Sequence, residues 1–398
     1  MSTSKLTNLP LPNPDFYRLE DDLSEAERAK ISEVRAFMQT KIEPIANEHW
    51  KADSFPFDVV PDFAKLGIVG AGYQGFGCPG GSTLFAGILA MEIARTDCSF
   101  ATFFGVHSGL AMGSIYLCGS DEQKQRWLPA MAKCEKIGSF GLTEPLVGSG
   151  TSRGMLTTAK RDGDKWILNG EKKWIGNATW GDITIIWARD IGDNQVKGFI
   201  VENKNPGFKA EKIENKMALK IVQNAHITLT DCVVPESDRL QLDQSFRDTA
   251  RVLRMTRAFV AWEAVGCMMG AYENALIYAQ KREQFGKPIA SFQLIQDLLA
   301  KMLGNLTASQ TMCFRLSQLQ DTGRLKDEHA SLAKAFCTVK MRECVGWARE
   351  LLGANGILLD NNIGRFVADA EAIYSYEGTR EMNTLIVGKA ITGIGAFV

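Results

Sequence analysis

The run DTARVLRMTRAFVAWEAVGCMMGAYENALIYAQKREQ, residues 248–284, decides the fold class because its apolar residues recur with a helical period. At 1.5 Å per residue such a helix would extend roughly 50 Å, which is longer than a small domain is wide. The helical period returns in three later runs, at residues 291–322, 329–353 and 379–394. Four long helices joined by short turns predict an antiparallel four-helix bundle in a C-terminal domain of residues 247–398.

The residues before this run change to a period of two, from about Ile137 to Ser245. In the segment KWILNGEKKWIG, Asn169 and Gly170 predict the type I′ turn of a hairpin. Three further strands are expected in the segments DITIIWARD, KGFIVEN and HITLTDCVVP. Together these segments predict a middle domain, residues 137–246, built as an antiparallel β-barrel-like or sandwich structure.

The first part of the chain, residues 1–136, has a helical period from Ser24 onward. Ser24 and Glu27 form a capping-box pattern before the segment AERAKISEVRAFMQTKI, and Pro44 is expected to interrupt that helix. Further helices are expected in the segments PDFAKLGIVG, STLFAGILAMEIARTD, FATFFGVHSGLAMGSIYLCG and SDEQKQRWLPAMAK. The predicted fold is therefore α+β and multi-domain, with a helical domain, a β domain and a helical bundle in that order.

Composition and spacing argue against several classes of function. The 45 Lys and Arg residues nearly balance the 46 Asp and Glu residues, so no nucleic-acid or anionic-membrane surface is expected. The start of the chain lacks a hydrophobic signal core and no long apolar run follows, so we expect a cytoplasmic protein, or an organelle-matrix protein if the chain is a mature form. The four histidines and nine cysteines show no metal-binding spacing, so no metal site is expected.

Glu377 lies in the segment IYSYEGTREMNTL (373–385), between an aromatic residue and a Gly-Thr pair, where a new helix is expected to begin. Glycine beside a helix start lets a ligand approach the backbone closely. A free carboxylate, with a pKa of about 4.3, is a weak base, but removal of water raises its basicity. Glu377 is therefore a candidate general base, and the alternative is a carboxylate that only complements the helix dipole.

Five short stretches, in this order and in this domain setting, resemble the acyl-CoA dehydrogenase superfamily along essentially the whole chain. The likeness is closest to glutaryl-CoA dehydrogenases and to the related plant short-chain acyl-CoA oxidases. The five stretches are FGLTEPLVGSG (140–150), KKWIGN (172–177), KREQFGKPIASFQ (281–293), LLGANG (351–356) and YSYEGTREMNTLIVGKAITG (374–393).

The resemblance implies an FAD-dependent desaturation of a short-chain acyl-CoA, of the kind used in fatty acid β-oxidation. The family places the base at the position of Glu377 and uses FAD N5 as the hydride acceptor. It implies a homotetramer and electron-transferring flavoprotein as the electron acceptor. Two enzyme alternatives remain: a short-chain acyl-CoA oxidase that uses oxygen, and a glutaryl-CoA dehydrogenase-like enzyme. A catalytically silent scaffold that binds flavin or CoA is the non-enzyme alternative.

The resemblance also implies positions that hold the cofactor and the substrate. Residues expected to contact the flavin part of FAD are Phe140, Leu142, Thr143, Ser149, Trp174, Ile175, Gly176, Thr379 and Glu381. Residues expected to hold the FAD pyrophosphate and adenosine of a neighbouring subunit are Arg282, Phe285, Gln293 and Gly353. Residues expected to contact the acyl-CoA are Thr102, Ser149, Arg254, Arg257, Gly378 and Phe397.

Four positions depart from the family's pattern. Gly176 stands where relatives usually have a Thr or Ser whose hydroxyl bonds to flavin N5, and the plant oxidase shares this glycine. Gly150 replaces a usual Asp, while Glu350 and Ala354 replace a common Gln and Gly near the adenine.

The helix stretch that carries a carboxylate-binding arginine in glutaryl-CoA dehydrogenases reads Ala101 at that position. Thr102 follows it, and no lysine or arginine lies between Arg95 and Lys124. Burying a substrate carboxylate without a partner costs several kcal/mol, so the sequence predicts an uncharged acyl chain.

Overall fold

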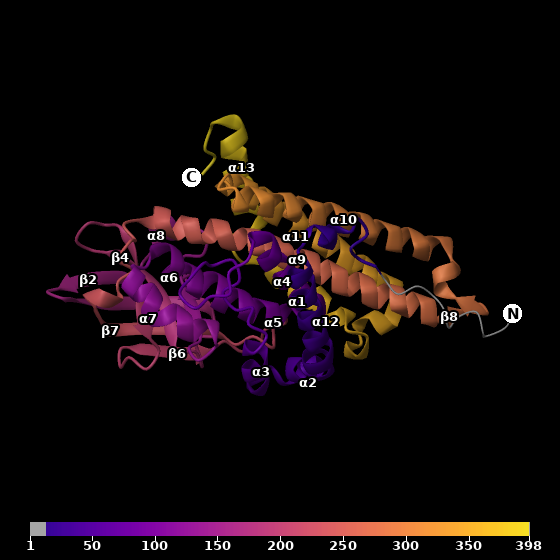
Figure 1. The fold of residues 1–398 in the computed structure, drawn as a ribbon, viewed down its shortest axis with the longest axis horizontal. Helices are drawn as coiled ribbons and strands as arrows, with labels where there is room; N and C mark the ends of the chain where they lie inside the picture. Colours follow the sequence, from indigo (N-terminus) through magenta and orange to yellow (C-terminus); the bar gives the residue numbers. More distant parts are fainter. Residues whose placement is uncertain (1–12, 398) are drawn as a thin grey trace.

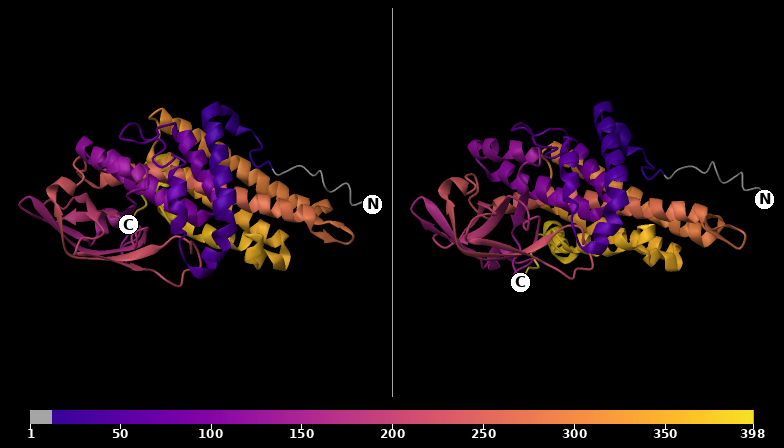
Figure 2. Two further views of the ribbon diagram at one scale, coloured as in Figure 1. Left: turned by 60° about the horizontal axis from the view of Figure 1, so that its bottom comes forward. Right: turned by 90° about the horizontal axis from the view of Figure 1, so that it is seen from below.

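The computed structural model describes residues 13–397 of the chain. Residues 1–12 and Val398, which belong to the first and last predicted domains, lie outside the described residues. The described part is α+β, with helices first, a sheet in the middle and helices again at the end. The strands of the main sheet gather at one end of the molecule, while the long helices extend to the other end, which carries the short strand β8 (Glu283–Gln284) (Figures 1 and 2).

The first helical part packs against the later bundle through α4 (Thr83–Thr96), which lies along α9 (Phe246–Lys281) (Figure 1). Ser24 caps the first α-helix in a capping box with Glu27, as predicted. Pro44 stands in the first turn of α2, where its missing N–H costs no bond, and a π-helical turn precedes it. The remaining helices here are η2 (Leu19–Asp22), α1 (Glu25–Phe37), η3 (Met38–Ile42), α2 (Glu43–Ala52), η4 (Phe57–Val59), α3 (Val60–Ala64), α5 (Cys98–Phe104), η5 (Gly105–Ala111), α6 (Met112–Cys118) and α7 (Asp121–Ala132).

The middle part is one curled seven-stranded sheet with the order β1-β4-β2-β3-β7-β6, in which β5 pairs with the other edge of β4. The pairings of β1 and β2 with β4 are parallel, whereas antiparallel strands were expected throughout. The strands are β1 (Gly138–Gly141), β2 (Thr158–Asp162), β3 (Lys165–Gly176), β4 (Ile183–Asp190), β5 (Val196–Glu202), β6 (Phe208–Lys212) and β7 (Asn224–Pro235), with a short helix α8 (Thr151–Gly154) after β1.

The predicted hairpin turn at Asn169 and Gly170 is wrong. Strand β3 runs straight through both residues, with a register shift against β7 between Leu168 and Gly170. At this bulge the Nδ2 of Asn169 donates to Oδ1 of Asp231 across the sheet at 3.1 Å. The Asn-Gly pair therefore forms part of a β-bulge and not a turn. The hairpin turn lies earlier, where β2 ends at Asp162 and Gly163 adopts a φ of 64°.

The C-terminal part contains the long helices that the periodicity predicts, and one more. Helices α9, α10 (Gln293–Asp321), α11 (Asp327–Leu351) and α13 (Arg380–Thr392) match the four predicted runs. Helix α12 (Ile363–Ser375), which the sequence analysis missed, packs on α9 and α11. A two-stranded hairpin of β8 (Glu283–Gln284) and β9 (Lys287–Pro288) follows α9, and short turns η6 (Glu236–Asp238), η7 (Ile289–Ser291), η8 (Gly353–Ile357) and η9 (Leu359–Asn361) complete the described elements.

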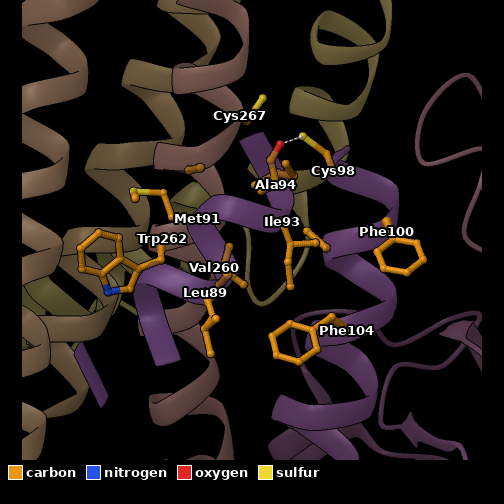
Figure 3. Close-up of a cluster of buried hydrophobic side chains, with 14 of the residues drawn as sticks. Leu89, Met91, Ile93, Ala94, Cys98, Phe100, Phe104, Val260, Trp262 and Cys267 are labelled. Carbon is orange, nitrogen blue, oxygen red and sulfur yellow. Dashed lines mark hydrogen bonds between the residues drawn. The ribbon is translucent and has the colours of Figure 1, made fainter. Parts of the chain in front are cut away.

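Part of the main hydrophobic core lies between α4, α5 and α9 (Figure 3). Phe104 of α5 points toward Leu89 and Ile93 of α4, and Trp262 of α9 lies on the opposite side of this cluster. Phe100 points away from α4, and its ring packs against Phe63. One helical stretch, Cys98–Cys118, is long and apolar enough to cross a membrane, but 78% of its apolar window is buried inside the described protein. That burial is typical of a core helix.

Close packing of α9 on α4 depends on two glycines. A side-chain carbon at Gly266 would lie 2.2 Å from the Met91 carbonyl oxygen, and one at Gly270 would lie 2.1 Å from the Arg95 carbonyl oxygen. Both contacts are with backbone atoms, so neither can be relieved by turning a side chain. The glycines therefore set the distance between the two helices.

We expect Gly266→Ala to lower the free energy of unfolding by roughly 3 kcal/mol, because α9 must move away from α4. The matched control is Gly304→Ala in α10, where an added side-chain carbon meets nothing within 4 Å and better helix propensity should stabilise slightly. Chemical unfolding of the three proteins measures the difference. Equal stability of the two variants would contradict this account of the helix contact.

Candidate active site

Glu377 lies in the turn between α12 and α13, and its backbone is left-handed with a φ of 54°. Gly378 follows with a φ of 87°, so two consecutive residues leave the usual backbone regions. Such strain persists only where surrounding contacts hold it, and it gathers at functional sites. Helix α13 begins directly afterwards, with Thr379 as its N-cap, where the sequence analysis expected a helix to begin.

Three side chains from different helices hold this turn. Lys334 of α11 is buried, and its Nζ donates to the carbonyl oxygens of Tyr374 at 2.7 Å and Gly378 at 2.8 Å. Asn383 of α13 donates to the same Gly378 oxygen at 2.8 Å. The Nε of Arg257 in α9 donates to the Glu377 carbonyl oxygen at 3.3 Å. Donors on three helices therefore define the backbone that carries Glu377.

The Glu377 carboxylate points at α9, where Thr256 Oγ1 donates to its Oε2 at 3.1 Å. Burial raises the pKa of Glu377, while the charges of Arg257 and Lys334 and the Thr256 hydrogen bond oppose that rise. Burial also lowers the pKa of Lys334 to about 7. The site thus contains a carboxylate with increased basicity and two neighbouring cationic side chains, which is suited to accepting a proton.

The residues predicted to contact acyl-CoA do not all gather here. Gly378 and Arg257 lie at the Glu377 turn, and Thr102 of α5 is buried close to Tyr376. Arg254 instead forms an ion pair with Asp327 at 2.8 Å. Two predicted positions lie elsewhere on the surface, Ser149 in an exposed loop after β1 and Phe397 beyond α13, where 46% of the side chain is exposed.

The π-helical turn η5 connects the Glu377 region to the sheet. A side-chain carbon at Gly105 would lie 3.0 Å from Glu263 Oε1 on α9, so this glycine faces the bundle. The next residue, Val106, faces the sheet, where its Cγ2 is 3.1 Å from a side-chain carbon built at Gly176. Single π-helical turns often occur at functional sites. Here the turn brings the predicted flavin strands beside the helices that hold Glu377.

Trp174 is presented by the second bulge of β3, between Lys173 and Ile175. Its backbone has a φ of 69°, and 55% of its side chain is exposed, although Ile175 beside it is buried. An exposed indole beside a strand end is a stacking surface for a flat ring. Three residues further on, the Asn177 Oδ1 atom is buried and has no hydrogen-bond partner among the described residues. These two features fit a bound flavin.

The other predicted flavin contacts divide into two groups. Phe140, Leu142 and Ile175 are buried in the sheet, so their backbone groups are the parts left for a ligand. Thr143 is half-buried at the end of β1. Thr379 already uses its hydroxyl to accept from the Met382 N–H, and Glu381 is exposed in the first turn of α13.

The residues predicted to reach a neighbouring subunit lie far from Glu377. Arg282 is 25 residues beyond Arg257 along the sequence of α9 and its cap, or about 38 Å along a helix. Arg282, Phe285 and Gln293 are all exposed, and Phe285 shows 91% of its side chain. Gly353 has a φ of 57°. It lies two residues before Asn355, whose Nδ2 donates to the hydroxyl of Tyr278 near the end of α9, so Gly353 is close to Arg282. One chain therefore does not bring these residues to its own Glu377.

An apolar cavity of about 120 Å³ lies beside Thr256, between α4, α9 and the helices α5 to α6. None of the charged side chains in residues 13–397 lines it. Phe104 of α5 lines the cavity, whereas Ala101 and Thr102 of the same helix do not, and Ala101 is fully buried elsewhere in the core. Trp262 forms one wall, and its Nε1 donates to Ser317 Oγ at 3.0 Å.

Sequence reasoning missed four residues of this site, namely Thr256, Glu263, Lys334 and Asn383. Glu263 had a visible signal, because it is the one acidic residue in the apolar stretch AFVAWEAVGCMMG. Thr256 and Lys334 had none, since an isolated Thr or Lys in a helix is usually a surface residue. Glu144 of the FGLTEP stretch forms a buried ion pair with Lys172 at 2.9 Å.

Three family models match the chain in succession. The acyl-CoA dehydrogenase N-terminal domain matches residues 24–135, the middle domain residues 139–232 and the C-terminal domain residues 246–392. Among curated proteins, the chain is 33% identical over 360 residues to a 3-(aryl)acrylate reductase of Clostridium sporogenes, covering 89% of this chain and 95% of that protein.

Solved structures agree with these matches. A glutaryl-CoA dehydrogenase from Mycobacterium smegmatis in complex with FADH2 has a TM-score of 0.93 and 34% identity, covering 96% of this chain and 98% of that one. Butyryl-CoA dehydrogenase from Megasphaera elsdenii has a TM-score of 0.89 and 27% identity, covering 93% and 99%. The chain therefore belongs to the acyl-CoA dehydrogenase family, whose members are FAD-dependent oxidoreductases acting on the CH–CH group of their donors.

Proposed function

We propose that this protein desaturates a short-chain, uncharged acyl-CoA between Cα and Cβ, with Glu377 as the base that removes the α-proton. The observation that carries the proposal is the half-buried Glu377 carboxylate, held in a left-handed turn and oriented by Thr256. Burial increases its basicity, which proton abstraction next to a thioester requires.

The surrounding residues have distinct roles in this proposal. Thr256 orients the carboxylate, and Arg257, Lys334 and Asn383 fix the backbone that carries it. The backbone N–H groups at the Gly378 turn can approach the thioester oxygen and stabilise negative charge that develops there. Trp174 and the end of β1 would hold the flavin of FAD, which would supply the acceptor for the β-hydride.

The apolar cavity supports a short uncharged tail. Thr256 both lines the cavity and bonds to Glu377, so a tail that starts beside the base can enter it. Its volume of about 120 Å³ is close to the roughly 150 Å³ of an apolar cavity that holds one benzene molecule. Trp262 and Gly87 both line the cavity, and the glycine leaves room for the indole, since a side-chain carbon at Gly87 would lie 2.2 Å from Trp262 Nε1.

The remaining parts of the proposal concern assembly and partners. Three domains, residues 1–136, 137–246 and 247–398, are supported by the three matched family regions. Because Arg282, Phe285 and Gln293 are exposed far from Glu377, they are suited to the FAD of a neighbouring subunit, as in a homotetramer. We also propose a cytoplasmic location and electron-transferring flavoprotein as the acceptor.

The short-chain oxidase is the second candidate, and Gly176 is the residue that raises it. Val106 lies beside this glycine, and its Cγ2 would be 3.1 Å from a side-chain carbon at position 176. The space left by the missing hydroxyl is therefore partly filled by an apolar side chain. This contact favours the dehydrogenase, because Val106 leaves less room for oxygen.

We expect the purified protein to be yellow and to release FAD on denaturation, because Trp174, Asn177 and the exposed end of α9 suit three parts of that cofactor. Absorbance and chromatography of the released compound measure this. A colourless protein that does not take up added FAD would contradict both the enzyme proposal and the scaffold alternative in its flavin-binding form.

Anaerobic titration with a panel of acyl-CoAs, followed by admission of air, tests the reaction and the acceptor. We expect bleaching of the flavin by short uncharged acyl-CoAs and little peroxide while product is bound. No bleaching by any acyl-CoA would favour the silent scaffold. Peroxide produced in amounts equal to turnover would show the oxidase instead.

A further inference from the structure

Glu263 is a buried acid in the middle of α9. Its side chain is 2% exposed, and Tyr376, the residue before Glu377, donates its hydroxyl to Glu263 Oε2 at 2.5 Å. Among the described residues, Glu263 forms no ion pair. An acid buried without a cation is stable only if it is neutral or bound to strong donors. The Tyr376 hydroxyl is the donor that the structure provides.

The space around Glu263 is adapted to it. A side-chain carbon at Gly105 would lie 3.0 Å from Glu263 Oε1 and 3.0 Å from the Phe259 ring, so the glycine of η5 leaves room for the carboxyl group. The ionisable groups that influence Glu263 are Tyr376 and Glu377. Cys98 of α5 influences Tyr376, and Arg257 and Lys334 influence Glu377.

We propose that Glu263 is a positioning residue for the desaturation: its uncharged carboxyl group holds Tyr376, and through it the turn that carries Glu377, and loss of its proton slows the reaction. This inference rests on the proposed function of Glu377. The inference adds a second carboxyl group to the site, and the two groups must have opposite protonation states. Glu377 must be charged to accept a proton, while Glu263 must be neutral.

The charge requirement follows from the surroundings of the two acids. Burial, opposed by the Tyr376 hydrogen bond and aided by the Glu377 charge, raises the pKa of Glu263 to about 8. At neutral pH the carboxyl group is therefore protonated. Above pH 8 it would become a second buried anion beside the site where negative charge develops on the substrate, and that charge disfavours the transition state.

The kinetic test is the pH dependence of anaerobic flavin reduction by butyryl-CoA, measured on both sides of pH 8. We expect the wild-type rate to fall above about pH 8, and Glu263→Gln to lose that fall while staying within about tenfold of the wild-type rate at neutral pH. An unchanged alkaline fall in the variant would overturn the proposal. So would a loss of reduction at every pH as large as that of Glu377→Gln, because Glu263 would then act in the chemistry itself.

A second variant, Tyr376→Phe, tests in which direction the alkaline fall of the rate moves along the pH scale. Tyr376→Phe keeps the ring and removes the hydroxyl that lowers the pKa of Glu263, so the alkaline fall should move to higher pH. It should also lower kcat more than it changes KM, because the turn is loosened and not the CoA contacts. A shift to lower pH, or no shift, would contradict the proposed link.

Stability provides a readout that needs no acyl-CoA. An acid whose pKa is raised in the folded state binds more protons folded than unfolded between its ordinary value and about pH 8. Its contribution to stability therefore falls as pH rises through that window. We expect Tm of the wild type, relative to Glu263→Gln, to decrease from pH 5 to pH 8. A constant difference would overturn the charge assignment even if the enzyme proposal holds. Failure of all acyl-CoAs to reduce the flavin would instead overturn the enzyme proposal and with it the positioning role, whatever the Tm difference.

Discussion

Glu377→Gln should lower the rate of flavin reduction by acyl-CoA by roughly three to four orders of magnitude, the upper range for loss of a positioned general base. Glutamine keeps the size of the side chain and can still accept a hydrogen bond from Thr256. The three donors from Arg257, Lys334 and Asn383 bind backbone atoms, so the turn itself should remain in place. The substitution therefore removes the proton acceptor and little else.

Stopped-flow reduction under anaerobic conditions measures this loss, alongside FAD content and CoA affinity. The matched control is Glu371→Gln on α12, a partly exposed carboxylate paired with Arg342 at 2.8 Å, which should stay within about twofold because surface ion pairs contribute little. FAD and CoA binding should be unchanged in both variants. Near-normal reduction by Glu377→Gln would place the base on another residue.

Much of the fold follows from periodicity in the sequence. Long apolar repeats predict α9, α10 and α11 because packing in a bundle demands one apolar face per helix. Helix α12 was missed because it follows Asn362, whose backbone is left-handed, and has Gly364 as its second residue. The Asn-Gly pair of β3 led to a wrong prediction of a hairpin turn, because the positive φ that such a turn needs is also adopted in a β-bulge.

The candidate site was only partly predictable, for a different reason. Glu377 and Gly378 stand together in one short segment, so their local pattern is visible in the sequence. Thr256 lies 121 residues away from Glu377 and Glu263 lies 113 residues from Tyr376, so their roles arise from the packing of α9 on the turn. Contacts made by tertiary packing leave no local pattern in a single sequence.

The second large effect concerns the charge of the substrate. Butyryl-CoA should exceed glutaryl-CoA in kcat/KM by at least about a hundredfold, since a buried carboxylate without a partner costs several kcal/mol. Among the residues that the structure describes, no charged side chain lines the cavity beside Thr256. The one histidine between Arg95 and Lys124, His107, is buried with its pKa lowered to about 4, so it is neutral and offers no positive charge. Each buried CH₂ of an uncharged tail instead gains about 0.8 kcal/mol.

The substitution Ala101→Arg is a poor test of this charge preference. Ala101 is fully buried, as are Phe100 and Phe103 beside it, and a guanidinium there would disrupt the core.

A matched substrate separates the effect of charge from that of chain length more cleanly. The methyl ester of glutaryl-CoA keeps the chain and removes the charge, so its kcat/KM should approach that of butyryl-CoA and far exceed that of the free acid. If ester and acid are equally poor, length and not charge limits the pocket. A wild-type preference for glutaryl-CoA would reverse the assignment, because some cationic group would then have to reach the tail of the substrate.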